Sequence, residues 1–204
     1  MAVFNLGYTA PINPPGASPV LNPTQVWAGL QRKVRHAEEF VPLFSACEVV
    51  SEEPGATEFD PYTVIRNVTI RPGGPPGGGP PGGPPPGGPG GAGGPPPGIM
   101  MGAGGPPGGG PPKGPIRNVC KLYAPSRVDF LREDGTKFSN YVTQGPSGEE
   151  TDMFMTYVFE WRHAGVEEGS EVWKKIREVH RKTARDAVEQ TIKRIRELVA
   201  EGQL

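Results

Sequence analysis

A block of glycine and proline interrupts this chain between residues 72 and 115. It holds 21 Gly and 17 Pro in 44 positions, and such residues favour neither a helix nor a packed core. The glycines fall at irregular intervals, which excludes a collagen triple helix. We therefore expect a disordered insertion at 72–115 and one folded domain built from residues 1–71 and 116–204.

The block itself has three interpretations on sequence alone. A dispensable surface loop is the simplest, because extending a short connection to 44 residues costs only about 2 kcal/mol of loop-closure free energy. Its Pro-Pro runs are also candidate ligands for SH3- or WW-type partners. An error in the gene model would account for the block as well.

Composition and charge exclude several classes of protein. The formal net charge of −1 argues against nucleic-acid binding, which depends on clustered Lys and Arg. No run approaches the ~18 apolar residues of a membrane span, and the N-terminus lacks the pattern of a signal peptide. Two Cys and three His show no metal-ligand spacing, and no phosphate loop is present. We expect a cytoplasmic protein with neither metal nor cofactor.

The rest of the chain reads as strands with two helical segments. Asn22, Pro23 and Gln25 predict a capped helix start, and an apolar stripe continues to Val41 before Pro42 ends the pattern. Turn residues and β-branched runs predict strands over 3–12, 46–52, 62–70, 116–123, 127–132, 137–143 and 152–162.

A long helix is predicted from Glu171 to Ala200, capped by Ser170. Such a helix needs a partner, and a curved antiparallel sheet offers one face for it. The sequence therefore predicts an α+β architecture in which about seven strands wrap around the C-terminal helix. The concave interior of that sheet is a candidate pocket.

These segments together resemble a START-like, birch-pollen-allergen-like (SRPBCC) domain, and within it a fungal and bacterial branch associated with polyketide pathways. The resemblance rests on residues 24–30 and 40–42, the strand pair at 120–130, Ser139-Asn140, the strand at 154–161 and the helix at 181–198. It implies a helix-grip fold with a hydrophobic cavity. It also implies a small hydrophobic ligand, with a polyketide as the candidate and pyrone-forming cyclisation as the candidate reaction.

Strand parity selects the side chains that could face this cavity. Met153, Met155, Tyr157 and Phe159 share one face of the last strand, which suits either a core or a ligand wall. Asn140 shares a face with Phe138 and Val142, so its amide points inward unless that strand end is solvated.

The C-terminal helix carries an apolar stripe that includes Trp173, His180, Ala184, Ala187 and Thr191. The small Ala184 and Ala187 predict room for a ligand under the helix. His180 breaks the stripe, and a buried His that titrates near neutrality could act as a general base. The alternative is a hydrogen-bonded structural histidine.

Arg66 and Arg117 occupy matching places in a repeated Ile-Arg-Asn-Val sequence. One parity turns both inward, where a guanidinium could hold an oxyanion. The other places both in water, and we favour it because an unpaired buried Arg is costly.

The catalytic candidates are therefore His180, Arg117, Tyr157 and Asn140. The candidate ligand-binding residues are Met153, Met155, Phe159, Trp173, Ala184, Ala187 and Thr191. The favoured function is a cavity protein of secondary metabolism that assists polyketide release or cyclisation. A non-catalytic carrier of a hydrophobic metabolite and an interaction protein acting through the Pro-rich loop are the alternatives.

Overall fold

The computed structural model describes residues 1–71 and 114–204. The expected disordered insertion at 72–115, with its candidate SH3 and WW ligands, lies outside the described residues except for its last two positions. No helix within the described part of the chain is long and apolar enough to cross a membrane.

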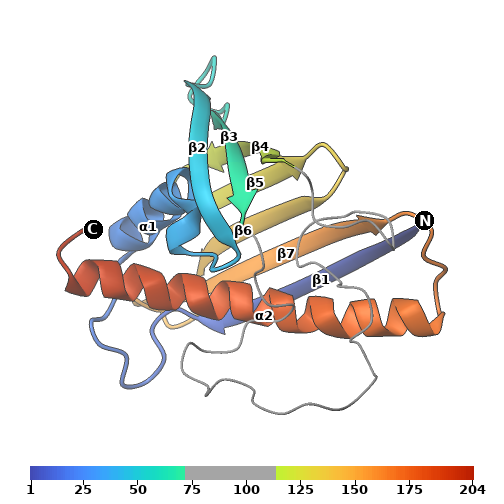
Figure 1. Cartoon of the computed structure of the whole chain (residues 1–204). Coiled ribbons are helices and arrows are strands. Elements are labelled where there is room, and N and C mark those ends of the chain that lie inside the picture. Colours follow the sequence, from blue (N-terminus) through green and yellow to red (C-terminus); the bar gives the residue numbers. More distant parts are fainter. Residues whose placement is uncertain (72–113) are drawn as a thin grey trace, which may run out of the picture.

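Seven strands form one antiparallel sheet in the order β1-β7-β6-β5-β4-β3-β2. Every neighbouring pair except β1 and β7 is consecutive in the sequence. The segment with the Gly/Pro block joins β3 to β4, and short connections join the other consecutive pairs. Figure 1 shows the sheet curving over α2. The strands are β1 (Ala2–Pro11), β2 (Phe44–Glu53), β3 (Tyr62–Ile70), β4 (Ile116–Tyr123), β5 (Arg127–Arg132), β6 (Lys137–Gln144) and β7 (Met153–His163).

The first helix, α1 (Pro23–Arg35), begins as the sequence predicts. The Asn22 side chain accepts a hydrogen bond from the Gln25 backbone N–H, and the Gln25 side chain accepts one from the Asn22 N–H. This reciprocal capping box satisfies two N–H groups that the helix start would otherwise leave unpaired. A short 3-10 helix, η1 (Ala37–Glu39), follows and returns the chain to β2.

The second helix, α2 (Glu171–Ala200), lies along the concave side of the sheet, with α1 beside its C-terminal end (Figure 1). The Ser170 side chain caps it by accepting a hydrogen bond from the Trp173 N–H. Its buried residues recur every three or four positions and face β1 and β7, where most of its contacts lie. The predicted helix-grip architecture is confirmed.

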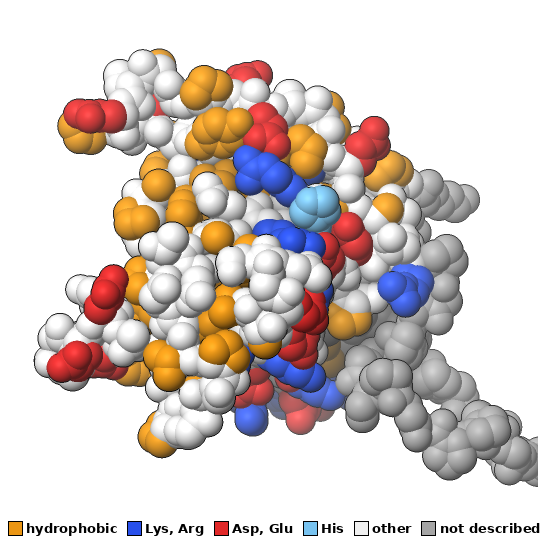
Figure 2. Space-filling model, turned by 90° about the vertical axis from the view of Figure 1, so that its left-hand side faces the viewer, with side chains coloured by type: hydrophobic (Ala, Val, Ile, Leu, Met, Phe, Trp, Pro, Cys, Tyr) orange, Lys and Arg blue, Asp and Glu red, His pale blue; other side chains and the backbone are white. Residues whose placement is uncertain are grey.

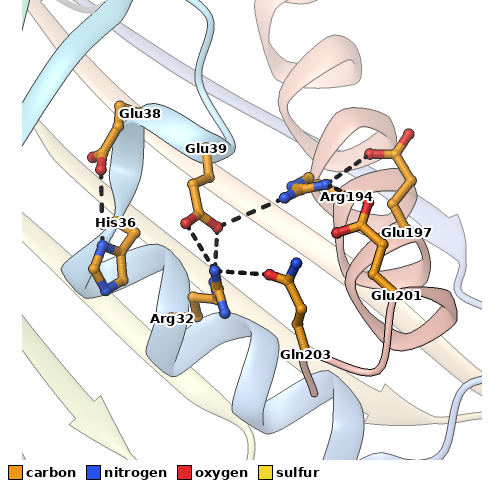
Figure 3. A network of polar contacts seen from close by, with 8 residues as sticks. All are labelled: Arg32, His36, Glu38, Glu39, Arg194, Glu197, Glu201 and Gln203. Atoms are coloured by element: carbon orange, nitrogen blue, oxygen red, sulfur yellow. Dashed lines mark hydrogen bonds and ion pairs between the residues drawn. The ribbon is translucent and has the colours of Figure 1, made fainter.

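Charged side chains join α1, η1 and α2 at the end of the molecule that carries the C-terminus. On this face they form a band of alternating positive and negative groups (Figure 2). Arg32 of α1 makes a bidentate ion pair with Glu39 of η1, at 2.7 and 2.9 Å. Glu39 also lies 4.0 Å from Arg194 of α2, which pairs with Glu197 and Glu201 (Figure 3). This network fixes α1 against the C-terminal end of α2.

Candidate functional site

Inward-facing side chains form transverse rows across the sheet, because directly paired residues of antiparallel strands share a face. The register defines three rows on the concave side. We name them the tyrosine row (Tyr62, Leu122, Val128, Asn140, Tyr157 and Tyr8), the phenylalanine row (Phe130, Phe138 and Phe159) and the arginine row (Arg66, Asn118 and Arg132).

The tyrosine and arginine rows lie four residues apart along the strands, about 13 Å at ~3.3 Å per residue. The apolar phenylalanine row lies between them. The concave interior is therefore apolar in the middle and polar at both ends.

Lys33 of α1 reaches into the interior at the tyrosine row. Its Nζ donates hydrogen bonds of 2.9 Å to Tyr157 Oη and to Thr191 Oγ1 of α2. The residue is only 8% exposed, and its Nζ lies 4.4 Å from the centre of the Tyr157 ring. Thr191 in turn donates to the Ala187 carbonyl, which fixes the direction of its hydroxyl. One amine thus connects α1, β7 and α2.

No carboxylate among the described residues pairs with this amine. Burial, and then the positive charge of Arg66, lower the pKa of Lys33 from 10.5 to about 7. Burial also raises the pKa of Tyr157, so its phenol stays protonated across the accessible pH range. The pair offers a base that titrates near neutrality beside a phenol that does not.

Arg66 caps the C-terminal end of α1. Its Nη1 donates 2.8 Å hydrogen bonds to the carbonyls of Lys33 and Val34, two acceptors that the helix terminus leaves without internal partners. The guanidinium also lies over the Phe130 ring, 5.1 Å from its centre. A cation at a helix C-terminus is favourable, since the carbonyl dipoles point toward it.

The arginines of the two Ile-Arg-Asn-Val segments point to opposite faces of the sheet. Neither of the two expected orientations therefore holds for both Arg66 and Arg117. Arg66 pairs with Asn118 and Asn67 pairs with Arg117 across β3 and β4. Arg66 is therefore buried, whereas the Arg117 side chain is 47% exposed on the outer face beside Glu133. The inward orientation of Arg117 is wrong, because the register pairs Arg66 with Asn118, and Arg117, the residue before Asn118, therefore points to the opposite face.

His180 belongs to a buried aromatic cluster away from Lys33. Its ring stacks on Trp161 at 3.9 Å between centres, and Trp161 stacks on Phe159 at 4.5 Å. His180 Nε2 lies 2.9 Å from His163 Nε2, so one ring donates to the other, while His180 Nδ1 is buried without a partner. Trp161 is four residues along β7 from Tyr157, and the Phe159 ring packs between the two.

The expected near-neutral titration of His180 is wrong. Burial, and then the neighbouring His163, lower its pKa to about 3. The imidazole is therefore neutral at physiological pH and a weak base. This arrangement fits the hydrogen-bonded structural alternative better than a general base.

The other sequence-derived candidates divide between the core and the Lys33 cluster. Tyr157 and Thr191 contact Lys33, and Asn140 pairs with Tyr157 across β6 and β7. The remaining side chains pack in the core without a polar role: Met153, Met155, Phe159 and Ala184 are buried, Ala187 is partly buried, and Trp173 stacks on Phe4.

The described residues line a groove and a smaller cavity on the concave side, and neither space is lined by a residue of α2. A groove of about 270 Å³ lies between α1 and the sheet, lined by Trp27, Gln31, Arg35, Tyr62, Leu122 and Ala124. A smaller cavity of about 50 Å³ lies near the arginine row. The small residues Ala184 and Ala187 therefore do not mark either space, and the groove instead meets the tyrosine row at Tyr62 and Leu122.

Neither a metal-ligand cluster nor a reactive thiol at Cys120 is found in the described residues. No group of three or more His, Cys, Asp or Glu side chains there could hold a metal ion. Cys120 is buried, and burial raises the pKa of its thiol to about 11, which suppresses the thiolate.

Comparison with known proteins supports a family assignment. Residues 6–202 match the family described as acetylaranotin biosynthesis cluster protein L. The chain belongs to this family. The comparison with curated proteins found no match.

Solved structures are also similar to this chain. The ZhuI aromatase/cyclase from Streptomyces sp. R1128 is 12% identical over all of both chains, with a TM-score of 0.52. TTHA0849 from Thermus thermophilus is 9% identical over 98% of this chain and 99% of its own, with a TM-score of 0.49. At 12% identity, the likeness to ZhuI shows the fold alone.

Sequence reasoning missed Lys33, the residue around which this site is built. Lys33 lies three positions after Leu30 and four before Ala37 on the apolar stripe of α1. A lone cation at a stripe position was the available signal. Its two hydrogen-bond partners could not be inferred, since they come from α2 and from a strand more than a hundred residues away.

Proposed function

We propose that this protein binds a polyketide acyl chain in the concave interior and promotes its cyclisation to a pyrone, with Lys33 as the general base. The observation that carries the proposal is a buried amine held between Tyr157 Oη and Thr191 Oγ1 with no carboxylate partner among the described residues. A cation without a counter-charge destabilises the folded protein, and such residues cluster at functional sites. Membership of a family named for a biosynthesis cluster supports a role in a biosynthetic pathway.

The chemistry of the cluster suits this role. A neutral amine has two N–H groups and one lone pair; hydrogen bonds to Tyr157 and Thr191 occupy the first two and leave the lone pair free. In a 3,5-dioxoacyl thioester, the enol oxygen at C5 loses its proton to Lys33 and bonds to the thioester carbon. The carbon–sulfur bond breaks, and the departing thiolate takes the proton back from Lys33.

Tyr157 would stabilise the charge that develops on the thioester oxygen. Its oxygen accepts a hydrogen bond from Lys33, so its own hydrogen can be donated to the substrate. Asn140, the next residue along the tyrosine row, would supply a second donor. The groove at the other end of this row, between α1 and the sheet, is the route by which the thioester enters.

The test follows pyrone formation from the 3,5-dioxohexanoyl thioester of N-acetylcysteamine, by absorbance and by release of the free thiol. The native protein should accelerate the reaction over its spontaneous rate, and Lys33→Met should lower that acceleration by about 10²-fold or more. Lys193→Met, which removes an exposed lysine of α2, is the matched control and should leave the rate unchanged.

Binding is measured separately by quenching of tryptophan fluorescence, since Trp27 lines the groove. Equal rates for Lys33→Met and the native protein would disprove the role of the amine. Binding without acceleration by the native protein would support the carrier function instead.

A further inference from the structure

The smaller cavity lies where β3 ends and β4 begins. Its volume of about 50 Å³ accommodates a few water molecules or one carboxylate group, and not a whole ligand. Two polar residues, Asn118 and Arg132, belong to its wall. The rest of the wall is apolar and consists of Phe44, Val68, Ile70, Ile116 and Phe138.

Arg132 is an incompletely satisfied donor in this wall. Its side chain is only 8% exposed, and its Nη2 forms a 2.9 Å ion pair with Asp134 Oδ2. Its Nε is buried and has no hydrogen-bond partner. An unpaired buried donor carries a desolvation cost, so an acceptor that fills the cavity would recover it.

Arg132 is the charged residue among the described residues that line the cavity. Arg66 lies in the same row as Arg132, on the far side of Asn118, and its Nε is also buried without a partner. Asp134 is the one carboxylate that pairs with either guanidinium among residues 1–71 and 114–204. Asn118 donates to the Ile116 carbonyl and adds no charge. The Arg132 guanidinium therefore keeps an unused N–H donor at the cavity, and such a charged fork favours an anionic acceptor.

The position of the cavity specifies which end of the ligand is anionic. The reacting thioester must lie at the tyrosine row, whereas the arginine row is about 13 Å further along the strands. The phenylalanine row between them is apolar, so an acyl chain that spans the two rows would pack against it. We propose that the small cavity binds a carboxylate at the distal end of the acyl chain, remote from the thioester. This inference rests on the proposed function, because it extends the same ligand from Lys33 to Arg132.

Binding of two ester probes of equal chain length tests the inference. Monomethyl decanedioate carries an ester at one end and a carboxylate at the other, and dimethyl decanedioate has an ester at both. The native protein should bind the monoester at least about tenfold more tightly, as measured by tryptophan fluorescence and calorimetry at neutral pH. Arg132→Gln should remove this preference and leave the affinity for the diester unchanged.

Arg117→Gln is the matched control, because Arg117 lies on the neighbouring strand but points outward, and it should keep the preference. Equal affinity of the native protein for both probes would overturn the inference whatever the variants do. Binding of the diester alone would overturn it too, while leaving the proposed function intact. Failure of both probes to bind would instead contradict the proposed function. If Arg132→Gln does not fold, the relative affinity of the native protein for the two probes still tests the inference.

Discussion

Arg32 and Lys33 are adjacent on α1, and each connects this helix to α2. Arg32 does so through an ion-pair network with Glu39, and Lys33 through a buried hydrogen bond. Arg32 is part of a partly exposed network in which Glu39 lies between two arginines, so its charge is matched by carboxylates. Lys33 is buried, and only Tyr157 and Thr191 among the described residues accept its hydrogen bonds. The contribution of the Arg32 ion pairs to stability is enough to explain them. The buried charge of Lys33 lowers stability, so its presence requires a functional explanation.

A substitution of Arg66 tests whether the buried C-terminal end of α1 depends on the guanidinium that binds its carbonyls. Replacement by Met removes both hydrogen bonds to the carbonyls of Lys33 and Val34, which then remain buried without these donors. We expect a loss of about 3 kcal/mol in the free energy of unfolding, the largest effect among these variants. Urea denaturation measures it, and Arg117→Met is the control on the outer face. A loss no greater than that of the control would show that Arg66 does not stabilise the helix end.

Lys33→Met should change the pH dependence of stability. The unfolded chain binds a proton at this lysine up to about pH 10.5, whereas the folded protein releases it near pH 7. The contribution of Lys33 to the free energy of unfolding therefore rises with pH between about pH 7 and pH 10.5. Relative to the variant, the native protein should gain about 2 kcal/mol between pH 7 and pH 9, at ~1.4 kcal/mol per unit once past the folded pKa.

The groups that face Lys33 are Arg66 from β3, Tyr157 from β7 and Thr191 from α2. Of these, Tyr157 keeps its proton over the measured range, because burial raises its pKa. Denaturation of both proteins at several pH values gives the difference directly. A difference that stays constant with pH would mean that Lys33 has an ordinary pKa, which would also remove the base from the proposed reaction.

Local sequence signals predicted the fold well, because they act over a few residues. The capping box of Asn22 and Gln25, the Ser170 cap and the strand limits follow from turn chemistry and periodicity, and the structure confirms them. The architecture then follows, since one long amphipathic helix and a strand meander leave few ways to bury their apolar faces.

The site was less predictable because it depends on register between strands. A repeat read along the chain gives both arginines the same parity, but antiparallel pairing sets Arg66 opposite Asn118 and turns Arg117 outward. The protonation of His180 likewise depends on how deeply the His163 pair and the Trp161 stack bury it. Neither fact is encoded in local periodicity.

Arg32→Met should have the smallest effect of the three variants and should depend on salt. The ion pair with Glu39 is about a quarter exposed, and Glu39 keeps a second cation, Arg194, at 4.0 Å after the change. We expect a loss of about 1 kcal/mol at low ionic strength, decreasing in 1 M NaCl as the charges are screened. Urea denaturation at the two salt concentrations measures it, with Lys193→Met as an exposed control. A loss that equals that of Arg66→Met and does not change with salt would contradict the contrast, since the Arg32 network would then behave as a buried contact.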